Sequence, residues 1–284
     1  MIRLLFLLFL PYPLFAQTVV GTLSKDLKEV SGLVFVKDDM MAGINDSGNS
    51  PTLYFINLKG EIQHETKLKD AVNVDWEDIA FNGKDKIYIG DFGNNDNKRT
   101  DLCIYEVSLK DALKDDKVDA KKLKFEYPDQ DKFPPKKKNL HFDCEAMAYY
   151  NDSLYLFTKS RAEPWDGMSY VYSIDPKDKN QKANLIGKLY VGKNGWWQDA
   201  ITAVDIQDGV CYILTYNRLM KYNIANQKLT FDQWVYMKPI TQKESFAVNS
   251  KGEIYVADEV QPGLGGGYLY KVVFPAKKKK KEKK

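Results

Sequence analysis

An all-β fold made of repeated units is predicted by three features of the 284-residue sequence. Aromatic residues make up 13% of the chain, and these residues favour strands over helices. A pattern of three short apolar runs separated by polar turns recurs five times. The N-terminal segment also resembles the one strand that the last repeat lacks. Together these features predict a β-propeller of five four-stranded blades, closed by the N-terminal strand.

Each repeated unit begins with two apolar runs that have the length and residue types of strands. The first runs are residues 31–35, 77–81, 145–149, 202–206 and 244–248. The second runs are residues 41–45, 87–91, 154–158, 211–215 and 254–258. The turns between them carry Asp, Asn and Gly, so each pair is expected to form a β-hairpin. A third run follows in every unit, and a fourth is visible in all units except the last.

The last unit and the start of the chain complete each other. Residues 18–25, TVVGTLSK, resemble residues 184–191, NLIGKLYV, which are the fourth run of the third unit. We therefore expect the N-terminal segment to fill the last unit and to remove an exposed sheet edge. Six blades are the alternative, if the charged insertion between Val107 and Asp143 hides a degenerate blade. A surface excursion that carries one strand explains this insertion more simply.

The chain is expected to be exported. Residues 1–16 resemble a secretory signal peptide, with one basic residue before an apolar stretch too short to span a membrane. Residues 17–275 are predicted to form one propeller domain, and residues 276–284 a disordered tail rich in lysine. A periplasmic or secreted monomer with no membrane span follows from this organisation.

Composition and motifs exclude several classes of function. The formal net charge is +3, and the lysine-rich tail accounts for this surplus. Without a basic stripe in the folded body, nucleic-acid binding is not expected. The sequence contains no P-loop, GxGxxG or GxSxG motif. Cys103, Cys144 and Cys211 lack metal-binding spacing and are expected to be buried thiols.

Polar residues gather where the first strands begin and the second strands end. In a propeller the first strand of each blade lines the central channel and the second runs antiparallel beside it, so these positions meet at one face. The five pairs are Ser31 with Asn45, Glu77 with Asp91, Glu145 with Thr158, Thr202 with Thr215, and Glu244 with Asp258. The longest loops crown this face, which we call the mouth, whereas the opposite face carries tight turns. The function is therefore expected at the mouth.

The carboxylates of this set predict a cation site. Carboxylates crowded at a channel mouth repel one another unless protons, hydrogen bonds or a cation compensate their charge. Oxygen ligands suit calcium or another hard divalent cation. The predicted metal ligands are Glu77, Asp91, Glu145, Glu244 and Asp258. The alternative is structural: each carboxylate accepts backbone N–H bonds at a strand end.

Three segments resemble a group of uncharacterised exported bacterial propellers. They are residues 45–49 (NDSGN), 75–80 (DWEDIA) and 90–95 (GDFGNN) with Arg99, in the same order as in that group. The group is distantly similar to SdiA-regulated, phytase-like and gluconolactonase/paraoxonase propellers. The last of these hold a catalytic calcium at the channel mouth, so the resemblance implies a cation here. Within these segments we expect ligand contacts from Asn45, Asp46, Trp76, Asp78, Asn94, Asn95 and Arg99.

Basic and aromatic residues on the mouth loops complete the candidate site. Lys159 and Arg161 would hold an anionic substrate above the acidic floor, unless they are ordinary solvated charges. Trp196 and Trp197 would suit sugars or other flat ligands, with packing under a loop as the alternative. His141 is the candidate catalytic residue, as a general base, and a plain loop histidine is its alternative.

The sequence therefore supports two hypotheses from different classes. The first is an exported propeller that binds a small molecule, a glycan or a cell-envelope protein at an acidic mouth stabilised by a cation. The second is a calcium-dependent esterase, lactonase or phosphoesterase that uses the same residues. Propellers host both kinds of function, so the fold cannot decide between them.

Overall fold

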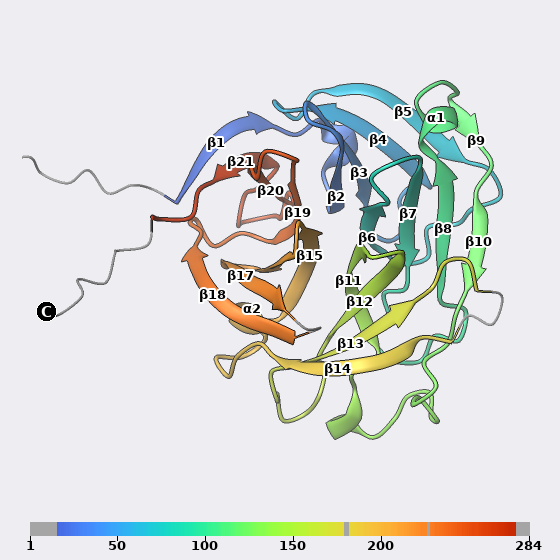
Figure 1. The fold of residues 1–284 in the computed structure, drawn as a ribbon, viewed down its shortest axis with the longest axis vertical. Helices are drawn as coiled ribbons and strands as arrows, with labels where there is room; N and C mark the ends of the chain where they lie inside the picture. Colours follow the sequence, from blue (N-terminus) through green and yellow to red (C-terminus); the bar gives the residue numbers. More distant parts are fainter. Residues whose placement is uncertain (1–15, 179–181, 226–227, 277–284) are drawn as a thin grey trace, which may run out of the picture.

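The computed structural model describes residues 16–178, 182–225 and 228–276, and these form five β-sheets arranged as a ring (Figure 1). The predicted five-bladed propeller is confirmed. The expected signal peptide and lysine-rich tail lie outside the described residues, apart from Ala16 and Ala276. No helix among the described residues is long and apolar enough to cross a membrane.

Each blade is an antiparallel sheet whose strands follow one another from the channel outward. Blade 1 contains β2 (Val30–Lys37), β3 (Met40–Asn45), β4 (Thr52–Asn57) and β5 (Ile62–Leu68). Blade 2 contains β6 (Trp76–Phe81), β7 (Lys86–Asp91), β8 (Cys103–Ser108) and β10 (Lys121–Lys124). Blade 3 contains β11 (Asp143–Tyr150), β12 (Ser153–Lys159), β13 (Met168–Ile174) and β14 (Asn184–Tyr190). Blade 4 contains β15 (Ile201–Gln207), β16 (Val210–Thr215), β17 (Arg218–Ala225) and β18 (Lys228–Tyr236).

Blade 5 joins the two ends of the chain, as predicted. It contains β19 (Lys243–Val248), β20 (Ile254–Asp258), β21 (Tyr268–Val272) and the N-terminal strand β1 (Gln17–Thr22), which pairs antiparallel with β21. Gly21 lies where β1 passes blade 1. A Cβ atom there would stand 1.9 Å from the carbonyl oxygen of Lys59, so the close approach requires glycine.

The charged insertion after Val107 is not a sixth blade. It contributes the short helix α1 (Leu109–Ala112), then β9 (Lys117–Val118), then β10. β9 pairs in parallel with the outer strand of blade 1, whereas β10 completes blade 2. The insertion therefore ties two neighbouring blades together at their outer edges. The remaining short helices are η1 (Lys25–Leu27), η2 (Lys137–Asn139) and α2 (Trp196–Asp199).

Apolar side chains fill the spaces between neighbouring blades. Five clusters of buried residues are found among the described residues, and each joins one blade to the next around the ring. The first contains Phe55 of blade 1 and Ile89 of blade 2, for example. Cys103, Cys144 and Cys211 are free thiols within three of these clusters, as the sequence predicts. Burial of apolar area holds the blades face to face.

The inner hairpin of every blade contains a β-bulge at the same place. In blade 2, Trp76 pairs with Asp91 and Asp78 pairs with Gly90, so Glu77 is the extra residue. The equivalent extra residues of the other blades are Ser31, Glu145, Thr202 and Glu244. Bulges bend a strand and turn a side chain in a new direction. The polar residues that begin the first strands are therefore all bulge residues.

Side chains satisfy the channel-facing edges of the innermost strands. The Ser31 hydroxyl donates to the backbone oxygen of Glu77 at 2.6 Å, across blades 1 and 2. Asp78 accepts the backbone N–H of Met147 in blade 3 at 2.7 Å, and that of Ile79 at 2.8 Å. Each bond crosses or supports a joint between blades where no strand pairing exists, so the ring depends on these few polar side chains.

Replacing Asp78 should measure how much one such contact between blades contributes to the free energy of unfolding. In Asp78→Ala the buried N–H groups of Met147 and Ile79 lose their acceptor, so the free energy of unfolding should fall by about 2–4 kcal/mol. Urea unfolding followed by circular dichroism gives this value. Asp39→Ala, at an exposed turn, is the matched control and should change it by less than about 0.5 kcal/mol. Equal effects of the two variants would contradict this account.

Candidate functional site

The mouth is built from two positions that recur in the blades. One is the bulge residue, and all five bulge residues are buried. The other directly follows the second apolar run of each unit, and it is occupied by Asp46, Phe92, Lys159, Tyr216 and Glu259. The sequence analysis named Asp46 and Lys159 but missed Tyr216 and Glu259. Their constant offset from the second run is the signal that would have identified them.

Five carboxylates from blades 5, 1 and 2 converge in what we call the acidic cluster. Oxygen atoms of Asp46, Glu244 and Glu259 lie within 4.8 Å of one another, and so do oxygen atoms of Asp46, Asp75 and Glu77. Asp46 belongs to both groups and stands at their junction. Among the described residues, no lysine or arginine forms an ion pair with any of these five carboxylates. The cluster therefore concentrates negative charge without an ion pair, and Lys159 and Arg99 act on Asp46 and Asp75 only as nearby charges.

Glu259 lies in surroundings that strongly disfavour its charged form. Its side chain is 2% exposed, and Oε2 accepts from Gln261 Nε2 at 3.0 Å. Oε1 is buried and has no hydrogen-bond partner among the described residues. Burial, followed by the neighbouring Glu244, raises the pKa of Glu259 to about 10. A carboxylate in such surroundings needs a proton or a cation nearby.

The pKa values of Asp46, Asp75 and Glu77 are shifted in the same direction. Burial and the nearby charge of Asp46 raise the pKa of Asp75 to about 7. Burial also raises the pKa of Asp46, and it raises that of Glu77 well above its usual value, with Glu145 as the next cause. Burial first, and then the like charges gathered in one cleft, explain the common direction.

Blades 3 and 4 form a basic and aromatic wall opposite in character to the acidic cluster. Lys159 is 3% exposed, and its Nζ donates to Glu145 Oε2 at 2.8 Å. The same Nζ lies 5.0 Å from the ring centre of Trp196 and 5.4 Å from that of Tyr216. Burial would lower the pKa of Lys159, but Glu145 and Tyr216 outweigh burial and raise it. Lys159 therefore stays charged, and it compensates Glu145.

Arg161 extends this wall toward the solvent. Its Nε donates to Asp143 Oδ2 at 2.6 Å, and its Nη2 reaches Glu145 Oε1 at 3.2 Å and Asn95 Oδ1. The guanidinium also lies 5.4 Å from the ring centre of Trp196. The structure thus brings together Lys159, Arg161, Asn95 and Trp196, which the sequence analysis assigned to ligand binding. It adds Asp143 as the carboxylate that fixes Arg161.

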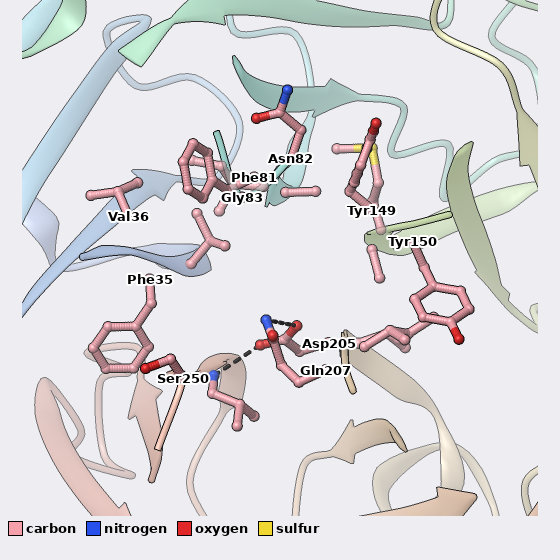
Figure 2. A pocket seen from close by; sticks show the side chains of 18 of the residues that line it. Phe35, Val36, Phe81, Asn82, Gly83, Tyr149, Tyr150, Asp205, Gln207 and Ser250 are labelled. Carbon is pink, nitrogen blue, oxygen red and sulfur yellow. Dashed lines mark hydrogen bonds between the residues drawn. The ribbon is translucent and has the colours of Figure 1, made fainter. Parts of the chain in front are cut away.

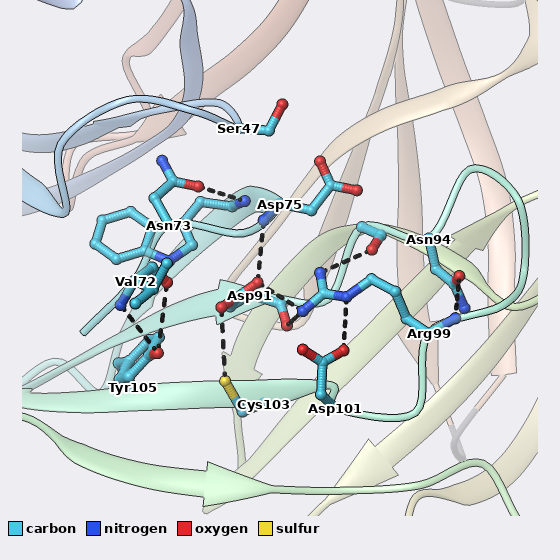
Figure 3. A network of polar contacts seen from close by, with 12 residues as sticks. Ser47, Val72, Asn73, Asp75, Asp91, Asn94, Arg99, Asp101, Cys103 and Tyr105 are labelled. Atoms are coloured by element: carbon cyan, nitrogen blue, oxygen red, sulfur yellow. Dashed lines mark hydrogen bonds and ion pairs between the residues drawn. The ribbon is translucent and has the colours of Figure 1, made fainter. Parts of the chain in front are cut away.

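Two of the predicted metal ligands, Asp91 and Asp258, are the last residues of β7 and β20 and bond to neighbouring segments. Asp91 Oδ1 accepts the backbone N–H of Asp75 at 3.1 Å and Nη2 of Arg99 at 2.9 Å (Figure 3). Asp258 accepts from the backbone N–H of Tyr268 at 2.8 Å and from the hydroxyl of Tyr270 at 2.8 Å. Neither belongs to the carboxylate groups that converge at the mouth, so their metal coordination stays a prediction.

The motif residues of blade 2 hold the mouth loop. The backbone N–H of Asn94 donates to Asp143 Oδ1 at 2.7 Å. The side-chain Oδ1 of Asn94 accepts the backbone N–H of Arg99 at 2.9 Å. Arg99 also bonds the backbone oxygen of Gly93 at 2.9 Å and the carboxylate of Asp101, as Figure 3 shows. These contacts fix the loop against blade 3 and leave ligand binding by Asn94 and Arg99 as a prediction.

The remaining predicted residues have structural contacts of their own. Asn45 Oδ1 accepts the backbone N–H of Glu29 at 3.2 Å, and Trp76 is fully buried between blades 1 and 2. His141 is also buried; its Nε2 contacts Asp166 Oδ2 at 2.6 Å, and its ring stacks on Tyr170 with 4.4 Å between ring centres. Its role as a general base stays a prediction.

The buried pair of Lys159 and Glu145 should dominate the stability of the wall. In Lys159→Met, Glu145 keeps only the contact from Arg161, so the free energy of unfolding should fall by about 3 kcal/mol. Adding Glu145→Gln should restore most of this loss, and chemical unfolding of both variants measures the coupling. Lys137→Met, at the exposed pair with Glu163, is the control and should cost less than about 1 kcal/mol. A double variant no more stable than Lys159→Met would disprove the coupling.

Comparison with known proteins identifies the fold. The sequence matches no protein-family model and no curated protein. Glutaminyl cyclase from Myxococcus xanthus is similar with a TM-score of 0.55 and 15% identity, over 90% of this chain and 95% of that chain. The soluble aldose sugar dehydrogenase from Escherichia coli has a TM-score of 0.53 and 11% identity, over 90% and 99%. The aldose sugar dehydrogenase from Streptomyces coelicolor is similar with a TM-score of 0.52 and 11% identity, over 90% of this chain and 98% of that chain. The chain is thus distantly similar in fold to propellers of several functions.

Proposed function

We propose that the protein binds a hard divalent cation, calcium first, in the acidic cluster of its mouth. The observation that carries this proposal is the buried, unpartnered Oε1 of Glu259 beside Glu244. A cation would compensate this oxygen and its neighbours together, whereas no basic side chain among the described residues does so. Oxygen ligands from carboxylates are the preferred partners of calcium.

The spacing of the oxygen atoms allows an ion in either of two groups that share Asp46. Calcium lies about 2.4 Å from its ligands, so two oxygens on the same ion are at most about 4.8 Å apart. Asp46, Glu244 and Glu259 each offer an oxygen within 4.8 Å of the others. Asp75 and Glu77 meet the same limit with Asp46 on its other side. An ion in either group would join two neighbouring blades at the mouth.

The second part of the proposal is a ligand held between the cation and the aromatic wall. Trp197 is 59% exposed and packs edge to face on Trp196, with 4.8 Å between ring centres. An exposed tryptophan beside a charged floor suits a glycan or a flat small molecule, and a partner's aromatic or polar loop is the third possibility. Because residues 1–16 resemble a signal peptide, we place this ligand in the periplasm or outside the cell.

Calcium should stabilise the protein, and Glu259→Gln should weaken that effect. Calcium at a hundred times its dissociation constant adds about 2.7 kcal/mol to the free energy of unfolding, which raises the melting temperature. Removing one ligand charge should lower the calcium affinity at least about tenfold. In chelator the same variant should be more stable than wild type, because glutamine requires neither a buried charge nor the proton that Glu259 must take up at its raised pKa. Metal analysis, calorimetric titration and melting curves measure the three effects.

Glu65→Gln is the matched control for this experiment. Glu65 is exposed on the outer strand β5, so its substitution should leave calcium affinity and stability unchanged. The proposal fails if purified protein contains no divalent ion and calcium does not move the melting curve. It also fails if Glu259→Gln binds calcium as tightly as wild type.

Calcium-dependent hydrolysis is a second candidate function. It is favoured by Asp75, whose pKa of about 7 suits a group that accepts a proton near neutral pH. Asp75 is a member of the acidic cluster next to Asp46, so with calcium held by Asp46, Glu244 and Glu259 it would stand beside the bound cation and a water molecule. The reaction class would be ester, lactone or phosphoester hydrolysis.

Asp75→Asn should separate hydrolysis from binding. If the protein is a hydrolase, calcium-loaded wild type should cleave nitrophenyl esters, lactones or nitrophenyl phosphate, and chelation should abolish the activity. Asp75→Asn should then lower the rate at least about a hundredfold while retaining a calcium-dependent shift in melting temperature. Absence of hydrolysis by the calcium-loaded protein would reject this candidate and leave the binding proposal intact.

A further inference from the structure

A cavity of about 710 Å³ opens at the other end of the channel, away from the mouth. We call it the turn-end cavity, because the turns between the first and second strands form its rim. Figure 2 shows its interior, with Phe81, Tyr149 and Tyr150 on its walls and Asp205 across from Phe81. The volume falls within the range of small-molecule sites, about 300–1,000 Å³. The sequence predicts only tight turns at this end of the channel, and the structure adds a cavity between them.

The cavity exists because one repeated position carries small side chains. Val34, Ala80, Ala148, Asp205 and Ala247 occupy the same register in the five innermost strands. Ala80 and Ala148 line the cavity, and their small side chains leave space that larger residues would fill. Asp205 is the one acidic member of the set. Apolar and aromatic side chains line the wall around Asp205, and the two other carboxylates of the lining, Asp38 and Asp208, lie on the turns of the rim.

The Asp205 carboxylate has unused acceptor positions and no cationic partner among the described residues. Its Oδ2 accepts the backbone N–H of Val248 at 2.8 Å, and its Oδ1 accepts from Gln207 Nε2 at 3.3 Å (Figure 2). A carboxylate has about four acceptor positions, so further donors fit. No lysine or arginine of the described chain forms an ion pair with it. Burial raises the pKa of Asp205 to about 6, so the group is still mostly ionised at neutral pH.

We propose that the turn-end cavity is a second binding site, for a compact ligand that carries a primary ammonium group on an apolar body. The ammonium would pair with Asp205, and the body would contact Phe81, Tyr149 and Tyr150. A carboxylate in an apolar, aromatic cavity binds an ammonium more strongly than it binds a neutral hydroxyl of the same shape. This site uses none of the mouth residues, so it stands independently of the proposed calcium site.

An ammonium of this kind has two sources. One is a free amine, and the other is a lysine of this chain. β21 runs parallel to β19, since both pair antiparallel with β20, so it ends on the same side of the ring as the turn-end cavity. The sequence continues beyond Ala276 with lysine-rich residues 277–284. Eight extended residues span up to about 26 Å, and β21 is about 10 Å from β19, so the cavity is within reach.

Titration with cyclohexylamine tests the site. The protein is labelled with ¹⁵N-valine, and the amide signal of Val248 is followed because this N–H bonds Asp205. Cyclohexanol is the neutral probe of the same shape. Asp205→Asn removes the charge but keeps an acceptor for the Val248 amide. Asp208→Asn is the matched control: Asp208 lies on the rim with a positive φ of 48°, which asparagine tolerates.

The proposal predicts saturable binding of cyclohexylamine, weakened about tenfold or more by Asp205→Asn and unchanged by Asp208→Asn. Cyclohexanol should bind wild type at least about tenfold more weakly. Each titration is run on the full chain and on a chain ending at Ala276. Binding that appears only in the shorter chain assigns the site to the lysines, whereas equal binding in both assigns it to a free amine. If neither chain binds, or if Asp205→Asn and cyclohexanol bind equally well, the proposal is overturned.

Discussion

The ring depends on how the innermost strands meet the channel. Each blade pairs its first strand on one side alone, so the other edge faces the axis with its backbone groups free. Apolar clusters hold the blades face to face, but they cannot satisfy these edges. Ser31, Asp78, Thr202 and Asp205 bond backbone groups of neighbouring blades instead. The polar side chains that face the channel are thus required to close the ring, whether or not they also bind a ligand.

The bulges convert this structural requirement into a place for function. An extra residue in each innermost strand interrupts the ladder at the mouth, and the five residues set free are polar. The blades then diverge in charge. In blade 3, Lys159 neutralises Glu145, whereas blades 5, 1 and 2 present carboxylates without such a partner. The asymmetry of an otherwise repetitive ring is what defines one side of the mouth as a candidate cation site.

Much of this arrangement could be predicted from the sequence. The five units, the closing strand and the polar ring of first-strand residues follow from spacing and residue type. The bulge could not be predicted, because a single extra residue leaves the apolar pattern intact. A regular ladder would set Glu77 opposite Asp91, but the bulge pairs Trp76 with Asp91 and separates the two carboxylates. The turn-end cavity could not be predicted either, since it arises from alanines whose small size matters only when five strands surround one axis.

The strand β1 gives the fold a temporal order as well as a shape. Blades 1 to 4 are each assembled from neighbouring stretches of chain, so their hairpins can form as soon as those stretches are available. Blade 5 has to wait, because its outer strand is the first part of the domain and its other three strands are the last. Until β21 is available, β1 has no partner in its own sheet. The face of blade 1 that packs against blade 5 also stays uncovered. The ring can therefore close only after the whole domain has been synthesised, because its first strand and its last strands belong to one sheet.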